Sequence, residues 1–268
     1  MMLASLPMYD LPGTADATAA FWHGLAGHLR HAGISDVPDR LAQQPTLPDH
    51  WLSRDLLLSQ TCGYPLISML KGRVQLVATP CYAAPGCEGP EYCSLIIVPA
   101  DSSAKALADL RGKRAAYNAP ESQSGFNVLR AAVAPLAERG RFFGAAIETG
   151  SHAASVELVA AGKADVAAID CVSFALFQRY GRPAASGVRV LCRSASAPSL
   201  PLIAAGDTDA DRLGRLRKGL RAAMADPKLV DAREALLLRD IMLLPDSAYE
   251  RIVEIERTAI QTGYPSLG

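Results

Sequence analysis

Short apolar runs alternate with segments of helical periodicity through the middle of the chain, and this alternation constrains the fold more than any other feature. Taken in order, the expected strands and helices occupy residues 92–98, 104–110, 113–117, 124–137, 145–149, 153–161, 164–169, 172–180 and 188–192. Strands separated by single helices are typical of βαβ units, in which neighbouring strands run parallel. The sequence therefore predicts an α/β protein with mainly parallel sheets flanked by helices.

The two ends of the chain extend this pattern. Strands are expected from Leu3, at 37–43, at 55–59 and at 74–79, with an amphipathic helix at 15–32. The tail reads as helices at 208–224, 228–236 and 246–262. A chain of 268 residues is long enough for two hydrophobic cores. We expect one lobe from residues 1–98 and 194–268 and a second lobe from residues 99–193.

Composition excludes several classes of protein. Twenty-seven basic residues balance 27 acidic residues, which gives no basic footprint for nucleic-acid binding. No apolar run approaches the about 18 residues of a membrane-spanning helix, so no membrane insertion is expected. The first ten residues lack the basic start and long apolar core of a secretory signal. We therefore expect a cytoplasmic protein as written, or a periplasmic one if a leader has been removed.

Six cysteines are present, without a CxxC pair or a Cys/His cluster of zinc-binding spacing. No metal or cofactor is therefore expected, and most of the thiols are interpreted as small buried side chains. Cys81 and Cys87 bracket a turn and can pair if that loop folds back.

The stretch from Asn118 to Arg130 is the first candidate site. It follows an expected strand and opens an expected helix, with Ser122, Ser124 and Gly125 at the helix start. The first N–H groups of a helix lack internal partners and carry partial positive charge, so this segment can cradle an anion. The alternative is that one of the serines only caps the helix.

Polar or aromatic residues also follow other expected strands, and ligands of α/β sheets sit beyond the carboxyl ends of strands. These residues are Tyr9, Gln60, Thr61, Cys62, Tyr82, Asn118, His152 and Asp170. Each has a structural alternative. His152 and Asp170 can belong to helix caps, and the tyrosines can be core aromatics. Cys62 can be a nucleophile at a helix start or a buried, inert thiol.

Several segments resemble, in the same order, the phosphate/phosphonate-type solute-binding proteins of ABC transporters. They are LLSQTCGYP at 57–65, Tyr92-x-Ser94-x-Ile96-x-Val98, DLRGK at 109–113, Asn118 with Ser122-x-Ser124-Gly125, Gly150-Ser151-His152 and VAAGKADVAAID at 159–170. The resemblance covers about residues 3–202. It implies a type II periplasmic-binding-protein fold, with two α/β lobes joined by crossing segments and a ligand cleft between the lobes.

The resemblance also implies roles for individual residues. Hydroxyls and amides at Ser122, Ser124 and Gly125 would hold an oxyanion, supported by His152. Asp170 would contact the far end of the ligand, often an amine, and Tyr9 would supply an aromatic contact. Gln60, Thr61, Cys62, Tyr82, Tyr92 and Asn118 complete the expected ligand-binding set. The implied partners are a small oxyanion and an ABC transporter permease.

Three functional hypotheses follow. The first is a solute-binding protein for phosphate, a phosphonate or a similar oxyanion, which closes on its ligand by a hinge and performs no chemistry. The second is a cytoplasmic, lyase-like biosynthetic enzyme on the same fold, with His152 or Asp170 as general base. The third is an intracellular ligand sensor whose helical tail from Thr208 contacts a partner.

Overall fold

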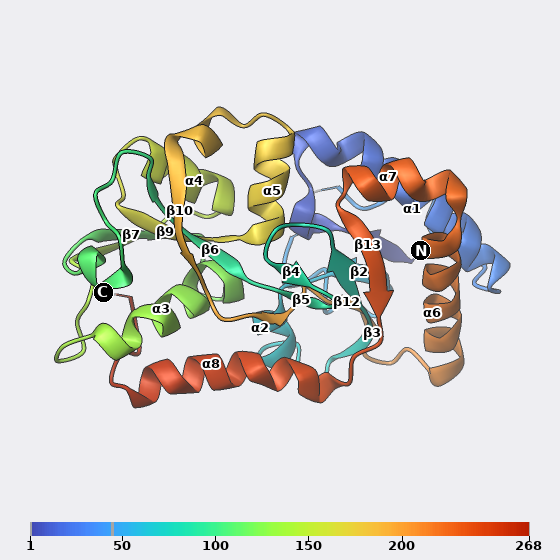
Figure 1. Cartoon of the computed structure of the whole chain (residues 1–268). Helices are drawn as coiled ribbons and strands as arrows, with labels where there is room; N and C mark the ends of the chain where they lie inside the picture. Colours follow the sequence, from blue (N-terminus) through green and yellow to red (C-terminus); the bar gives the residue numbers. More distant parts are fainter. Residues whose placement is uncertain (1, 44–45, 268) are drawn as a thin grey trace. The chain divides into compact units, whose positions relative to one another are not determined.

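The computed structural model describes residues 2–43 and 46–267, and the chain forms two compact units. Unit 1 comprises Met1–Ala83 with Pro198–Ala248, and unit 2 comprises Ala84–Ala197 with Tyr249–Gly268. Figure 1 shows the elements of both. Short 3-10 turns join them: η1 (Pro7–Tyr9), η2 (Pro12–Thr14), η3 (Leu107–Leu110), η5 (Ala134–Leu136), η6 (Pro183–Gly187), η7 (Pro227–Leu229) and η8 (Asp246–Tyr249).

Unit 1 contains a five-stranded mixed sheet. Its strand order is β1 (Leu3–Ser5), β2 (Leu56–Gln60), β12 (Leu202–Ala205), β3 (Val74–Tyr82) and β13 (Leu238–Met242). β1 runs parallel to β2, and β12 lies antiparallel between β2 and β3. β1, β2 and β3 therefore point the same way, so their carboxyl ends meet at one edge of the sheet.

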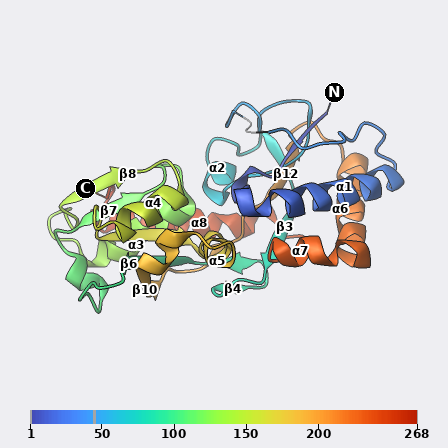
Figure 2. The ribbon, with the colours of Figure 1, turned by 90° about the horizontal axis from the view of Figure 1, so that it is seen from above.

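The helices of unit 1 are α1 (Ala15–His31), α2 (Gly63–Ile67), α6 (Ala210–Ala225) and α7 (Val230–Ala235). α1 buries Phe21, Leu25 and Leu29, which recur at the four-residue spacing of one helix face. Gly33, with φ of 93°, follows the end of α1 in the left-handed conformation that glycine adopts without strain. α1 packs beside α6 and α7, as Figure 2 shows.

Both faces of the unit 1 sheet are covered. Alternate side chains of β12 belong to two different hydrophobic clusters, one on each face. Leu202 and Ala204 belong to the core formed with α1 and α6, whereas Ile203 and Ala205 pack with Trp51 and neighbouring residues. All four residues are buried. A strand that is apolar on both faces reads as a continuous apolar run, as this one does in the sequence.

Unit 2 contains a second five-stranded mixed sheet. Its order is β10 (Val188–Arg193), β6 (Ser94–Pro99), β9 (Val166–Asp170), β7 (Arg114–Tyr117) and β8 (Ala145–Glu148). β7 runs parallel to both β8 and β9, while β6 is antiparallel to β9 and β10. A small sheet is formed by β11 (Ala197–Pro198), β5 (Glu91–Tyr92) and β4 (Cys87–Glu88).

The helices of unit 2 are η4, a π-helical turn (Gln123–Asn127), α3 (Val128–Val133), α4 (His152–Ala160), α5 (Cys171–Arg179) and α8 (Glu250–Gln261). In β6, Ile96 and Val98 belong to the core that contains the α3 side chains. The alternate residues of the same strand point to the opposite face, which α4 covers. α8 packs on α3 (Figure 1).

The predicted α/β class is confirmed, with a correction to the sheets, which are mixed rather than mainly parallel. The expected strand at 37–43 is wrong, because this segment has no ladder partner and its carbonyls accept side-chain donors instead. Trp22 donates to Pro38 O, and Arg30 donates to Val37 O. The expected helix at 104–110 is reduced to η3. β13 lies between the expected helices at 228–236 and 246–262, in a segment for which no strand was predicted.

The unit boundaries also differ from the expected lobes at 1–98 with 194–268 and 99–193. Residues 84–98 group with unit 2 because β6 pairs with β9 and β10. The last residues of the chain group with unit 2 because α8 packs on α3. Helical periodicity in the C-terminal segment predicts which face of the helix is buried. It does not predict which part of the protein that face packs against.

In residues 2–43 and 46–267, none of the helices has both the length and the apolar character needed to cross a membrane.

Candidate functional site

The carboxyl ends of β7, β8 and β9 meet at one edge of the unit 2 sheet, because these three strands are parallel. This edge brings together five predicted site residues from three segments. We call this group the polar edge: Asn118, Ser122, Ser124, Gly125 and His152.

The start of η4 shapes the backbone of the polar edge. Ser122 is the N-cap, and its Oγ accepts a hydrogen bond of 2.9 Å from the Gly125 N–H. Its carbonyl accepts from the N–H groups of Phe126 and Asn127. A wide turn of this kind is frequent at functional sites. The capping interpretation of Ser122 is therefore correct, while the hydroxyl of Ser124 points elsewhere.

Ser124 is joined to His152 across the edge. Its Oγ lies 2.8 Å from His152 Nε2. His152 is the first residue of α4, whose N-cap is Ser151, with Oγ accepting from the Ala154 N–H. Ser151, rather than His152, thus caps this helix. The imidazole is left to contact Ser124.

Burial lowers the pKa of His152 to about 4, because the charged imidazolium would lose its hydration. The ring is therefore neutral at pH 7, and one of its nitrogens carries a proton while the other accepts. Its Nδ1 is inaccessible to solvent and has no hydrogen-bond partner among the described residues. If Ser124 donates to Nε2, the ring proton is on Nδ1. The Nδ1–H group can then donate a hydrogen bond to a bound anion.

Gly125 makes room for a second unpartnered atom. A Cβ at this position would lie 1.8 Å from Asn118 Oδ1 and 3.3 Å from His152 Cε1. Asn118 Oδ1 is buried and also lacks a partner within the described parts of the chain. Buried polar atoms in proteins are nearly always satisfied, by protein, water or ligand. The two orphan atoms around one glycine therefore point to a ligand position.

Asp170 ends β9 at the same sheet edge. It is 2% exposed, and its Oδ1 accepts 2.8 Å from the Ser173 N–H, which makes it the N-cap of α5. The capping alternative is correct for this residue, although a carboxylate has further acceptor sites. Tyr92, in β5, is buried at 3% exposure.

Unit 1 places three other predicted residues together at the carboxyl ends of β1, β2 and β3. We call Tyr9, Gln60 and Tyr82 the aromatic edge. The rings of Tyr9 and Tyr82 meet edge to face at 5.1 Å between centroids. Gln60 Nε2 donates to Tyr82 Oη at 2.9 Å and to Leu200 O at 3.1 Å.

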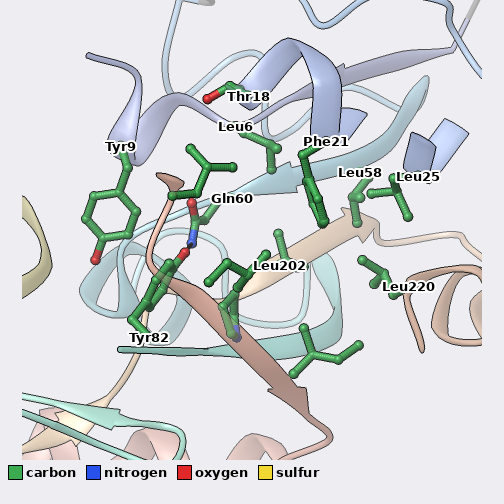
Figure 3. Close-up of a pocket in the computed structure, with 14 residues that line it drawn as sticks. Leu6, Tyr9, Thr18, Phe21, Leu25, Leu58, Gln60, Tyr82, Leu202 and Leu220 are labelled. Atoms are coloured by element: carbon green, nitrogen blue, oxygen red, sulfur yellow. Dashed lines mark hydrogen bonds between the residues drawn. The ribbon is translucent and has the colours of Figure 1, made fainter. Parts of the chain in front are cut away.

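An apolar cavity of about 50 Å³ lies against the aromatic edge within unit 1 (Figure 3). α1 and β2 supply Phe21, Leu25 and Leu58, and the second chain segment of the unit supplies Leu202 and Leu220. No signal in the sequence indicates this cavity, because its walls come from segments that lie far apart along the chain. In the sequence, a leucine that lines a cavity looks the same as a leucine of the hydrophobic core.

The two remaining predicted residues make mainly backbone and capping contacts. Thr61 is fully buried, and its N–H donates to Pro201 O at 3.0 Å. Cys62 occupies the N-cap position of α2. The Cys81–Cys87 pairing that the sequence left possible is not present: both are free thiols, and Cys87 Sγ lies 3.5 Å from Cys171 Sγ instead. Across residues 2–43 and 46–267, no group of three His, Cys, Asp or Glu residues is arranged to hold a metal.

Comparison with solved structures identifies the fold. A binding-protein component of an ABC phosphonate transporter from Pseudomonas aeruginosa matches with a TM-score of 0.77 at 17% identity, over 97% of this chain and 87% of that one. PhnD1 from Prochlorococcus marinus in complex with methylphosphonate matches with a TM-score of 0.77 at 15% identity, over 97% and 98%. A Xanthomonas citri protein bound to ATP matches with a TM-score of 0.70 at 18% identity, over 97% and 98%.

These likenesses define the fold: it is the α/β fold of two-lobed periplasmic binding proteins. A search of the curated proteins gives no match. The family model described as "ABC transporter, phosphonate, periplasmic substrate-binding protein" matches residues 55–243, more than two thirds of the chain. The chain belongs to this family, as the resemblance of its motifs predicted.

Proposed function

We propose that this protein binds a small organophosphonate or a closely related phosphoryl oxyanion and delivers it to the permease of an ABC transporter. Membership of the phosphonate-binding family supports the transport role, and PhnD1, which shares the fold, is known with methylphosphonate. A periplasmic location is part of this proposal, because the family is periplasmic. The family does not favour the enzyme hypothesis.

The polar edge carries the proposal. Ser124 Oγ and the His152 ring lie in hydrogen-bond contact, beside a glycine and two buried atoms that have no partner among the described residues. With Ser124 donating to Nε2, the His152 Nδ1–H is a neutral donor, which suits an anion that keeps its charge on binding. Backbone N–H groups at the starts of η4 and α4 add to the attraction for an anion.

The other predicted residues complete the proposed site. Asp170 is proposed to contact an amine of the ligand through its carboxylate. The hydrogen bond from the Ser173 N–H holds this carboxylate in position. Tyr9, Gln60, Thr61, Cys62, Tyr82 and Tyr92 remain proposed ligand contacts.

Isothermal titration calorimetry of the purified protein tests the proposal, with methylphosphonate, 2-aminoethylphosphonate, inorganic phosphate and acetate as probes. A phosphonate or phosphate should bind, and acetate should not. Ser124→Ala should weaken binding, while Ser186→Ala, which removes an exposed hydroxyl that donates to Pro183 O, should not. Absence of heat and of thermal stabilisation with every phosphoryl probe would sink the proposal.

A further inference from the structure

Three of the six cysteines gather at one place in unit 2, and the proposed ligand set includes none of them. Cys87 Sγ lies 3.5 Å from Cys171 Sγ. The Cys171 thiol also shares a hydrogen bond with the thiol of Cys93. Cys171 is therefore the central member of a cluster of three thiols, which we call the thiol cluster: Cys87, Cys93 and Cys171.

Backbone contacts hold the cluster together. The hairpin of β4 and β5 closes with a 3.1 Å hydrogen bond from the Cys93 N–H to Gly86 O. The Cys171 N–H donates to Cys93 O, also at 3.1 Å, which continues the antiparallel register of β6 and β9 by one residue. Cys93 and Cys171 are therefore opposite one another, and the hairpin turns Cys87 onto them.

Gly86 allows this packing. Its φ of 110° is in the region that favours glycine, and a Cβ there would lie 2.8 Å from Cys93 Sγ and 3.2 Å from Cys171 Cβ. Any larger residue would push the hairpin off the two buried sulfur atoms.

The three thiols differ in access. Cys171 is 0% exposed and Cys93 is 4% exposed, whereas Cys87 is only partly buried. The hydrogen bond with Cys171, followed by burial, raises the pKa of Cys93. The hydrogen bond with Cys87, together with burial, raises the pKa of Cys171, so these two thiols hold their protons at neutral pH. Cys87 is thus the thiol that an oxidant in solution can reach first.

We propose that Cys87 and Cys171 form a disulfide when the protein meets a small-molecule disulfide oxidant, with Cys93 as the thiol that can replace Cys87 as partner. The two sulfur atoms need to approach by roughly 1.5 Å to reach bonding distance. Cys87 lies in a two-stranded hairpin that can supply this movement. The family's periplasmic location is an oxidising compartment in which such bonds persist.

With oxidised glutathione the reaction balances in two exchanges. The Cys87 thiolate attacks one glutathione sulfur, which breaks the glutathione disulfide and releases one glutathione thiolate. Cys171 then loses its proton and attacks the Cys87 sulfur of the mixed disulfide, releasing the second glutathione. Two protein thiols become one disulfide, and the two electrons reduce oxidised glutathione to two glutathione thiols.

The bond would fix the 84–93 hairpin to the first residue of α5, directly after Asp170. A link between residues 84 positions apart restricts the unfolded chain strongly, so the oxidised protein should melt several degrees higher than the reduced protein. This inference does not rest on the identity of the ligand, and its test contains no ligand.

The test equilibrates the folded protein with oxidised glutathione, quenches it with acid, counts thiols after denaturation and maps peptides without reduction by mass spectrometry. The count should fall from six to four, with the Cys87 peptide joined to the Cys171 peptide. Six persistent thiols, a stable glutathione adduct on Cys87, a link between two chains, or a bond using Cys62, Cys81 or Cys192 would each overturn the proposal.

Variants distinguish the roles proposed for Cys87 and Cys171 from the effects of misfolding. Cys171→Ser should stop at the mixed disulfide of Cys87 with glutathione and form no internal disulfide. Cys87→Ser should lose two thiols at least tenfold more slowly, because both remaining members are buried. Cys192→Ser, which removes a partly buried thiol of the same unit outside the cluster, should behave as the wild type. Circular dichroism should show all three folded. An internal disulfide that forms rapidly in Cys171→Ser would contradict the central role of that residue.

Discussion

The polar edge of unit 2 and the aromatic edge of unit 1 occupy equivalent places in their sheets, at the carboxyl ends of parallel strands, yet their chemistry is opposite. The polar edge leaves Asn118 Oδ1 and His152 Nδ1 buried without partners. At the aromatic edge, Gln60 donates to both Tyr82 and Leu200. One edge therefore has unused hydrogen-bonding capacity, and the other is a finished network beside an apolar cavity.

This difference shows that the carboxyl ends of strands determine where a site can lie, whereas the side chains there determine whether it binds a ligand or stabilises the fold. Unused buried donors and acceptors are costly unless a ligand or water fills them. A satisfied network with aromatic rings instead contributes stability and shape. We therefore expect changes at the polar edge to act mainly on ligand affinity, and changes at the aromatic edge to act mainly on folding stability.

The largest effect is expected for Gly125→Ala. The new Cβ would overlap Asn118 Oδ1 and displace both Asn118 and the His152 ring from the ligand position. Losing the hydrogen bond from His152 Nδ1–H and the space that the anion occupies beside Gly125 should weaken methylphosphonate binding about 100-fold in calorimetric titration. Gly214→Ala, at a helical glycine with open space around it, is the matched control and should bind as the wild type. Equal binding by the two variants would remove Gly125 from the site.

Ser124→Ala is expected to have the next largest effect. It removes the hydroxyl that lies 2.8 Å from His152 Nε2 and that, by donating to this nitrogen, keeps the ring proton on Nδ1 as the donor to the anion. Affinity should fall about tenfold while the melting temperature of the ligand-free protein changes little. A large loss of melting temperature without a change in affinity would reverse the comparison between the two edges.

Acid should destabilise the protein through His152. The folded protein holds the pKa of His152 near 4, whereas an unfolded histidine has its model value of 6.5. Below pH 6.5 the unfolded state therefore binds more protons, and the free energy of unfolding falls from pH 6.5 to about 4. Urea unfolding at several pH values should show a smaller fall in His152→Gln.

His23→Gln, which changes an exposed histidine of α1, is the control for this experiment and should retain the wild-type pH dependence. Burial also lowers the pKa of His50 in unit 1, so some acid destabilisation should survive in His152→Gln. An unchanged pH dependence in His152→Gln would mean that its imidazole is not desolvated in the folded protein.

The smallest effect is expected for Tyr82→Phe at the aromatic edge. The ring remains against Tyr9, but Gln60 Nε2 loses the hydroxyl that accepts its hydrogen bond. Stability in urea should fall by about 1 kcal/mol, with less than a threefold change in affinity for methylphosphonate. A greater loss of affinity than in Ser124→Ala would make the hydroxyl of Tyr82 a principal ligand contact.

The sequence by itself determined the α/β class and the positions of most elements, because periodicity and turn residues are local signals. It also located the start of η4 and the strand ends where site residues cluster. The motif order was sufficient to indicate the family. Local propensity could not show that β12 would insert antiparallel between β2 and β3, which made the sheet mixed.

Only the tertiary structure decided which of these residues meet. Asn118, Ser124 and His152 come from three segments, and their contacts depend on the parallel pairing of β7 and β8. The sequence also does not indicate the partner of Cys87. Cys171 is 84 residues away in the chain, and the pairing of β6 with β9 brings the two residues together. Long-range pairing is set by the burial of whole faces, and no short stretch of sequence encodes it.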